Sequence, residues 1–256
     1  MRRKPAFFFI FALAICFLYN VTVLAQTIRD DDSKHLPTKS PEGEKTKKLP
    51  DPLVDKDLKL IPLSQEKSIF LAQDRSCLIV LGEICLREGM LEFFLCSNNS
   101  KEHESIIATK AKPSLIHVGL LAMGAEPGKS VQYTPNFIAA SGPQINITVR
   151  WLDQNGKQQE AKAEEWVQES KTKNQMSTHW VFTGSMFQKL ENNKNQYLAD
   201  VTGEIIGVSN FPTVVLDLPI ESTSDNSVLL FQAYTERIPP VGTPVTIILK
   251  KEGEKR

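Results

Sequence analysis

Side chains able to do chemistry are concentrated in one part of the sequence. They are Cys85, Cys96, Lys101, His103, Glu104, Ser105 and His117. A metal-site interpretation takes four of them as ligands: Cys96, His103, Glu104 and His117. Thiolate, imidazole and carboxylate groups suit zinc or a redox-active metal. Their spacing matches no compact metal motif, because Ile107 stands where the second histidine of H-E-x-x-H would be.

Nucleophilic catalysis is a second interpretation of the same residues. Ser105 or Cys96 would attack a substrate after activation by His103 or His117, but no nucleophile-elbow sequence surrounds Ser105. A structural interpretation makes His117 a core histidine bonded to a loop carbonyl, while His103 and Glu104 fix the loop through hydrogen bonds. Cys96 then serves in packing. We favour this structural interpretation, and predict no catalytic residue and no cofactor.

A predicted β-hairpin leads into the polar loop that carries these residues. Two apolar runs, Cys77–Leu86 and Met90–Cys96, flank a turn-like break at Glu88-Gly89. In that register Cys85 lies about 13 Å from Cys96 along the paired strands. A disulfide needs Cα atoms within about 7 Å, so the hairpin and a Cys85–Cys96 bond exclude each other. We therefore predict the hairpin, with the thiols left as small buried apolar groups.

A helix is predicted directly after the loop. Ser114 is a suitable N-cap, Gly124 fits the position just past the C-terminus, and Pro127 blocks continuation, which gives a helix over Ser114–Met123. Apolar residues surround its axis, so we expect the helix to be buried.

The second half of the chain reads mainly as β-structure. Asn155-Gly156 is a strong hairpin turn, and Ala161–Glu169 is a candidate for a second short helix that presents Trp166. Further strands are predicted at Trp180–Phe182, Glu204–Val208, Thr213–Leu218, Leu229–Tyr234 and Val245–Leu249. The predicted fold class is α+β, a mainly antiparallel sheet with one buried helix.

The N-terminus indicates export. A cationic start is followed by an apolar run and by Val23-Leu24-Ala25, which predicts a signal peptide over residues 1–25. The alternative is an uncleaved N-terminal membrane anchor. Residues 26–62, rich in proline and charge, are predicted to be a disordered linker. We expect a globular domain over residues 63–250, a polar tail over residues 251–256, and a secreted or periplasmic location.

Charge and composition restrict the partners. Thirty basic and thirty acidic residues cancel, so the chain lacks the overall positive charge that is typical of nucleic-acid binding. Three cysteines remain after export, without C-x-x-C spacing, which argues against an iron–sulfur cluster. Membrane contact is expected only transiently, through the signal segment.

Several longer stretches resemble one family of proteins. They are GEICLREGMLEFFLC (Gly82–Cys96), KEHES (Lys101–Ser105), IHVGLLAMGAEPG (Ile116–Gly128), WVFTGS (Trp180–Ser185), SNFPTVVLDLPIES (Ser209–Ser222) and ERIPPVGTPV (Glu236–Val245). Together they resemble the YdjY domain family, bacterial exported proteins of uncharacterised function. The resemblance implies an envelope or secreted protein and implies no established activity. It places Cys85, Cys96, His103, Glu104 and His117 within matching motifs.

We therefore expect a non-enzymatic binding or structural module of the cell envelope, with an unknown envelope partner or ligand. The alternative is a metal- or haem-dependent redox protein that uses Cys96, His103 and His117. A hydrolase that uses Ser105 is a third hypothesis.

Overall fold

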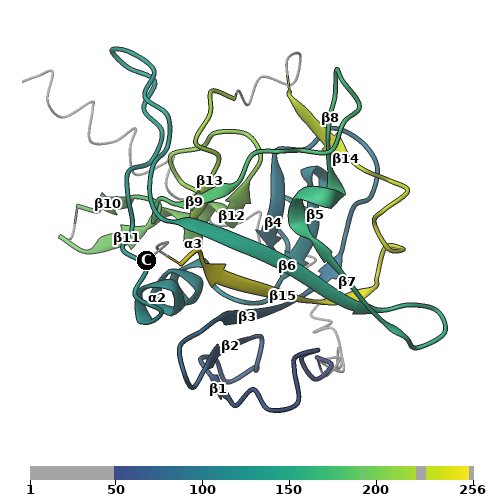
Figure 1. Ribbon diagram of the computed structural model, residues 1–256. Helices are drawn as coiled ribbons and strands as arrows, with labels where there is room; N and C mark the ends of the chain where they lie inside the picture. Colours follow the sequence, from purple (N-terminus) through teal and green to yellow (C-terminus); the bar gives the residue numbers. More distant parts are fainter. Residues whose placement is uncertain (1–48, 192, 223–228, 254–256) are drawn as a thin grey trace, which may run out of the picture. The chain divides into compact units, whose positions relative to one another are not determined.

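A computed structural model describes residues 49–191, 193–222 and 229–253 (Figure 1). The predicted signal peptide, the linker up to residue 48 and the last three residues of the polar tail lie outside these described residues. Residues 49–62, also assigned to the linker, include strand β1 (Leu60–Pro62), which pairs with β2 (Ile69–Ala72). Leu49, Val54 and Leu58 pack on a small apolar cluster around Cys77 and Ile79.

Eight of the described strands form a closed barrel. In order around the barrel they are β3 (Leu78–Ile84), β15 (Pro244–Lys251), β6 (Gln144–Leu152), β9 (Trp180–Phe182), β13 (Leu216–Asp217), β12 (Glu204–Gly207), β4 (Phe93–Ser97) and β5 (Ser105–Thr109). The circle closes because β5 also pairs with β3. The expected α+β fold is therefore wrong: the structure is 37% strand and 11% helix, and its main sheet is closed instead of open.

The predicted hairpin between Cys77–Leu86 and Met90–Cys96 is also wrong. Strand β5 lies between β3 and β4, antiparallel to β3 and parallel to β4. The sequence pattern does not predict β5, although its residues are all buried. Ile107 in β5 pairs with Ile84 on one side and with Leu95 on the other. Alternating apolar residues show which face of a strand is buried, but they do not identify the neighbouring strand.

The main helix, α2, spans Pro113–Ala122, close to its predicted position. The prediction that Ser114 is the N-cap is wrong: Lys112 is the N-cap, and Pro113 occupies the first helical turn, where a missing N–H costs little. Gly124 follows the helix with φ 75°. The expectation of a buried helix is wrong in part. Ile116 and Leu120 are buried, whereas Val118 and Leu121 are exposed, because α2 lies on the outside of the barrel beside β2 and β3. None of the helices in the described residues is long and apolar enough to cross a membrane.

Three shorter helical segments complete the described helices. The 3-10 helix η2 (Ala163–Trp166) lies within the predicted second short helix and places Trp166 in the core. The 3-10 helix η1 (Glu102–Glu104) follows β4, and α3 (Leu198–Thr202) precedes β12. Neither η1 nor α3 was predicted.

Outside the barrel circle, other strands form short pairs. The predicted hairpin at Asn155-Gly156 is confirmed, since β7 (Gln158–Lys162) pairs with β6. β8 (Val167–Glu169) pairs with β14 (Phe231–Ala233). β10 (Phe187–Lys189) and β11 (Asn195–Tyr197) form a hairpin that Figure 1 shows at the left of the molecule.

An aromatic cluster anchors the main core. Phe94 lies between Trp180 and Trp166, with ring centroids 5.5 Å and 6.3 Å away. The indole N–H of Trp180 donates to the carbonyl of Gly207, 2.6 Å away. The core therefore ties β4, β9 and β12 together, and these strands carry several of the polar residues described next.

Candidate functional site

The fold brings two cysteine side chains together. The Cys85 and Cys96 thiols are close enough that each shifts the pKa of the other. The Cys85 thiol lies 3.0 Å from the carbonyl oxygen of Ser105, and the Cys96 thiol also meets the hydroxyl of Ser105 and the backbone N–H of Lys101. Cys96 is fully buried and Cys85 is half-buried. The distant placement expected from the hairpin is therefore wrong, because β5 replaces the direct β3–β4 contact.

These surroundings distinguish the two thiols electrostatically. The neighbouring Cys85 thiol is the main reason that the pKa of Cys96 is lowered, and the contacts with Ser105 and Lys101 act in the same direction. The pKa of Cys85 is raised, first by the neighbouring Cys96 thiol and then by burial. Cys96 is consequently the better thiolate and Cys85 the better proton donor.

Next to the thiols, the loop residues form a charged group. The Lys101 ammonium lies 3.0 Å from a carboxylate oxygen of Glu104, and the imidazole of His103 lies 3.7 Å from the same oxygen. The side chain of His103 is 74% exposed. Glu102 accepts the backbone N–H groups of Asn99 and Ser100. Most of these contacts fix the loop internally, as the structural interpretation expects.

Two buried glutamates join this group, and sequence reasoning missed both. Burial, followed by the nearby charge of Glu104, raises the pKa of Glu92 to about 7. Glu204 is also buried and accepts a hydrogen bond from Thr213. The one available sign was the charged Glu92 within the apolar run MLEFFLC. Glu92 can hold a proton near neutral pH, but its partners are neighbouring side chains of the same cluster.

His117 belongs to a different contact. Its Nδ1 lies 3.0 Å from the carbonyl oxygen of Gly184 and 3.0 Å from the hydroxyl of Tyr197. Phe182 and Tyr197 present ring edges at centroid distances of 5.1 Å and 5.4 Å. Burial lowers the pKa of His117, so the neutral ring is favoured. These are the contacts of a core histidine bonded to a loop carbonyl.

The metal and nucleophile interpretations find no support in this geometry. Among the described residues, no group of three or more His, Cys, Asp or Glu side chains is placed to hold a metal ion. His117 packs with Gly184 and Tyr197, whereas His103 is exposed on the loop. Ser105 is fully buried, and its hydroxyl donates to the carbonyl of Ile107 at 3.1 Å.

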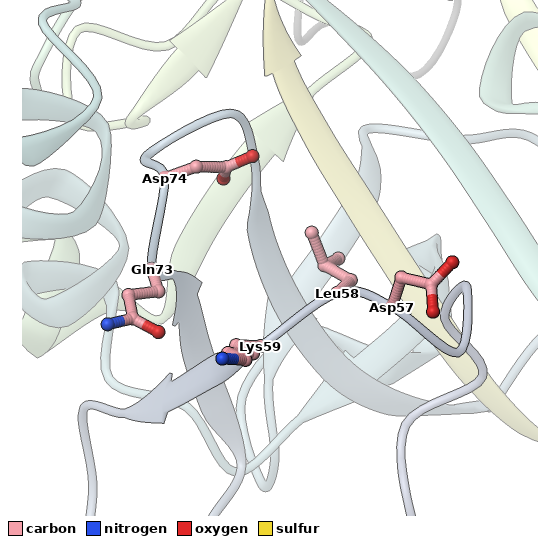
Figure 2. A pocket seen from close by; sticks show the side chains of 5 residues that line it. All are labelled: Asp57, Leu58, Lys59, Gln73 and Asp74. Atoms are coloured by element: carbon pink, nitrogen blue, oxygen red, sulfur yellow. The ribbon is translucent and has the colours of Figure 1, made fainter.

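Two surface hollows offer little to a ligand. The first, with a volume of about 270 Å³, is lined by Asp57, Leu58, Lys59, Gln73 and Asp74. Figure 2 shows the Asp57 and Asp74 carboxylates well apart, and Asp74 already accepts the N–H of Ser76. The second lies at the start of α2, where Asp200 accepts the N–H of Ser114 at 2.8 Å. A carboxylate therefore already occupies the end of the helix that would attract an anion.

An exposed apolar surface is the more prominent feature. We define the α2–β10 face by six exposed side chains from neighbouring elements: Val118, Leu121, Met186, Phe187, Leu190 and Val201. Their elements adjoin, since Asp200 of α3 bonds to α2 and the Phe187 ring lies 5.0 Å from Tyr197, which contacts His117. Figure 1 shows α2, α3, β10 and β11 on the same side of the molecule. Sequence reasoning missed this face because it expected α2 to be buried.

Exposed lysines accompany the apolar side chains. Lys110 and Lys112 precede α2, and Lys189 lies in β10 beside Phe187. Asp200 and Glu191 are the acidic residues nearest in sequence to the same elements. The face thus combines apolar area with a surplus of positive charge at its edge.

The greater part of the chain is similar to a known protein family. A family model described as YdjY domain matches residues 74–250. This range runs from just before β3 almost to the end of β15 and includes all seven candidate residues. The comparisons with curated proteins and with solved structures find no match.

Proposed function

We propose that this chain, which belongs to the YdjY domain family, is an exported, non-enzymatic module of the cell envelope that docks on an anionic lipid surface. The α2–β10 face carries this proposal. Phe187 is 63% exposed and Val118 is 54% exposed. Extended exposed apolar patches on soluble domains mark sites of interaction.

The chemistry of the face suits the surface of a membrane. Apolar side chains gain free energy by leaving water for the acyl boundary, and lysines near an anionic surface add about 1 kcal/mol each. Phe187, Lys189 and Leu190 follow one another closely in and after β10, so one short strand presents both kinds of group. An anionic lipid surface matches both the apolar side chains and the lysines.

From the sequence, membrane contact is expected only through the signal segment. The exposure of α2 extends that expectation to the folded domain. A non-catalytic role accords with the internal bonds of the polar candidates: Ser105 donates to Ile107, and His117 is held by Gly184 and Tyr197. Export directed by the predicted signal peptide, residues 1–25, would release the domain beside a membrane.

Sedimentation with vesicles tests the proposal. The exported chain is mixed with phosphatidylcholine vesicles that contain or lack phosphatidylglycerol. Transfer of about two thirds of a phenylalanine side chain is worth about 1–2 kcal/mol, so Phe187→Ser should weaken partitioning about tenfold. Val118→Ser should weaken it to a smaller extent.

A matched control lies before the start of β15, whose other end carries Lys251, which donates to the carbonyl of Gly124 just after α2. Val241 is 58% exposed in the turn before β15, so Val241→Ser removes similar apolar area away from the α2–β10 face. It should leave partitioning within about twofold of the unaltered chain. Equal binding of all variants, or no binding to anionic vesicles, would overturn the proposal. Loss of self-association in Phe187→Ser without vesicle binding would assign the face to a second copy of the chain.

A further inference from the structure

We infer that residues 129–141 form an arm whose tip inserts into the boundary between lipid headgroups and acyl chains, beside the α2–β10 face. This inference rests on the proposed function, because it names a second contact with the same lipid surface. Figure 1 shows the arm as the long loop between α2 and β6, rising at the upper left.

The base of the arm is fixed to the barrel. The N–H of Gly128 donates to the carbonyl of Phe182 in β9 at 2.9 Å, and the N–H of Phe182 donates to the carbonyl of Pro143 at 3.0 Å. A Cβ on Gly128 would collide with the carbonyl oxygen of Ser141, so the two sides of the base touch through their backbones.

Backbone pairing then extends the arm. Lys129 and Ser141 exchange two hydrogen bonds of 2.9 Å each, and Gln132 and Ile138 exchange two of 3.0 Å and 2.8 Å. Residues 133–137 form the tip. Because the base and the paired part are already ordered, little conformational entropy is lost when the tip enters a lipid surface.

The arm adjoins the α2–β10 face. A Cβ on Gly184, two residues before Met186, would lie 2.6 Å from Pro127 and 3.1 Å from the ring of His117. Pro127 leads into the arm, and His117 belongs to α2. Figure 1 shows the arm, α2 and the β10–β11 hairpin on the left of the molecule. One lipid surface can therefore meet all three.

The tip exposes apolar side chains. Ile138 is 53% exposed and Tyr133 is 47% exposed. The Tyr133 hydroxyl donates to the carbonyl of Asn210 at 2.8 Å, and its ring lies 5.9 Å from the ring of Phe137. The tyrosine is thus held in place with half of its surface in water. Aromatic rings with a polar end are enriched at membrane–water interfaces.

Beyond its base the arm carries no charge. Asp, Glu, Lys and Arg are absent from Ser130 to Val149, although 23% of the residues of the chain are charged. The β6–β7 hairpin is also exposed at its turn, yet it carries Asp153, Lys157 and Glu160. A charge is costly at the acyl boundary, so its absence from the tip suits insertion there.

Backbone groups limit the depth of insertion. Among the described residues, one hydrogen bond reaches a backbone group of the tip, from the side-chain amide of Gln132 to the carbonyl of Thr134 at 2.7 Å. The other polar backbone groups of the tip need water, which the hydrocarbon core does not supply. The tip therefore enters the boundary region, about 5–10 Å deep, and does not cross it.

Two substitutions compare the arm with a similarly exposed site elsewhere. Ile138→Ser removes apolar area from the arm, and Leu152→Ser removes it from the charged β6–β7 hairpin, where Leu152 is 49% exposed. On phosphatidylcholine vesicles that contain phosphatidylglycerol, Ile138→Ser should weaken partitioning about fivefold. Leu152→Ser should leave it within about twofold. Equal partitioning of the two folded variants would overturn the inference.

Fluorescence measures insertion while the apolar residues stay in place. Asn136 is exposed at the tip, so Asn136→Trp places an indole there, and Gln158→Trp places one at the exposed start of β7 as a control. Phosphatidylcholine brominated on its acyl chains quenches nearby indoles. Relative to the unaltered chain, the added emission of vesicle-bound Asn136→Trp should be quenched, and that of Gln158→Trp should not.

The outcomes separate the arm from the proposed function. Vesicle binding without quenching of Asn136→Trp overturns the arm alone. No vesicle binding by the unaltered chain overturns both. Quenching of Asn136→Trp, together with binding that Phe187→Ser leaves unchanged, supports the arm and overturns the role of the α2–β10 face. Loss of self-association in Ile138→Ser, with no quenching, would assign the arm to a second copy of the chain and overturn its insertion into lipid.

Discussion

Asp217 carries a buried carboxyl group whose replacement gives a sharp test of the barrel's electrostatics. The side chain is fully buried in β13. Its Oδ1 accepts the side-chain amide of Asn210 at 3.1 Å and the N–H of Leu218 at 2.8 Å, whereas Oδ2 has no hydrogen-bond partner among the described residues. Burial raises the pKa of Asp217 from 3.8 to about 7. Asp217→Asn keeps the shape and the Oδ1 acceptor but cannot ionise.

The direction of the pH effect follows from proton uptake. Between about pH 4 and pH 7 the folded chain keeps a proton on Asp217 that the unfolded chain releases. The free energy of unfolding therefore falls as the pH rises through this window, and the contribution is constant above it. A change in pKa from 3.8 to about 7 corresponds to about 4 kcal/mol at full ionisation. Asp217→Asn should lack this loss.

Urea unfolding, followed by tryptophan fluorescence from about pH 5 to about pH 8, measures the effect. Other groups titrate in both proteins, so the informative quantity is the difference in unfolding free energy between Asp217→Asn and the unaltered chain. Between about pH 5 and about pH 8 this difference should shift in favour of the variant by about 3 kcal/mol, out of the total of about 4 kcal/mol at full ionisation. Asp153→Asn is the control, because hydrogen bonds with Gln159 lower the pKa of Asp153 and its titration ends below the window. A constant difference for Asp217→Asn across the range would refute the reasoning.

Two further predictions concern α2 and its contacts. Burial lowers the pKa of His117 from 6.5, so the unfolded chain takes up a proton before the folded chain does as the pH falls. The free energy of unfolding therefore decreases below about pH 6.5. In thermal melts at about pH 5 and pH 7, His117→Phe should lose less stability at the lower pH than the unaltered chain does. In Gly119→Ala the new Cβ would lie 2.3 Å from a methyl group of Leu78, so an overpacking cost of about 1–3 kcal/mol should exceed the helix-propensity gain of about 1 kcal/mol. Its Tm should fall, and Leu78→Val should restore part of the loss; a higher Tm for Gly119→Ala alone would contradict the close packing of α2 on β3.

The sequence was most informative where structure is local. The turn residues Asn155-Gly156 correctly predicted the β6–β7 hairpin, and Pro113 and Gly124 bracket α2 for reasons that lie within a few residues of the chain. The membership of the YdjY domain family was also predicted and is confirmed. Export stays a prediction, because residues 1–25 lie outside the described part.

Pairings between distant strands could not be predicted in the same way. Leu78–Ile84 and Phe93–Ser97 are apolar enough to be buried wherever they lie, so their pattern fitted a hairpin that does not exist. The short strand Ser105–Thr109 lies between these two strands and so excludes the hairpin. Nothing in its local sequence shows that it pairs with both β3 and β4. The prediction that α2 is buried failed for a similar reason. Its apolar residues indicated burial, but how the helix lies against the barrel determines which of them face water.

In the candidate site, too, the contacts within the loop could be predicted and the contacts between distant segments could not. Lys101 and Glu104 are three residues apart in the loop and contact each other as proximity predicts. Glu92 joins them only because β4 and β5 are parallel, which brings its backbone N–H to the carbonyl of Glu104. His117, only fourteen positions beyond His103 in the sequence, turns toward Gly184 instead. Proximity in sequence thus predicted the loop contacts and failed once the chain entered the barrel.

The thiol pair and the closure of the barrel have one structural cause. If β3 and β4 had formed a hairpin, Cys85 and Cys96 would have been kept about 13 Å apart. Insertion of β5 between them joins the two ends of the sheet and also turns both thiols toward Ser105.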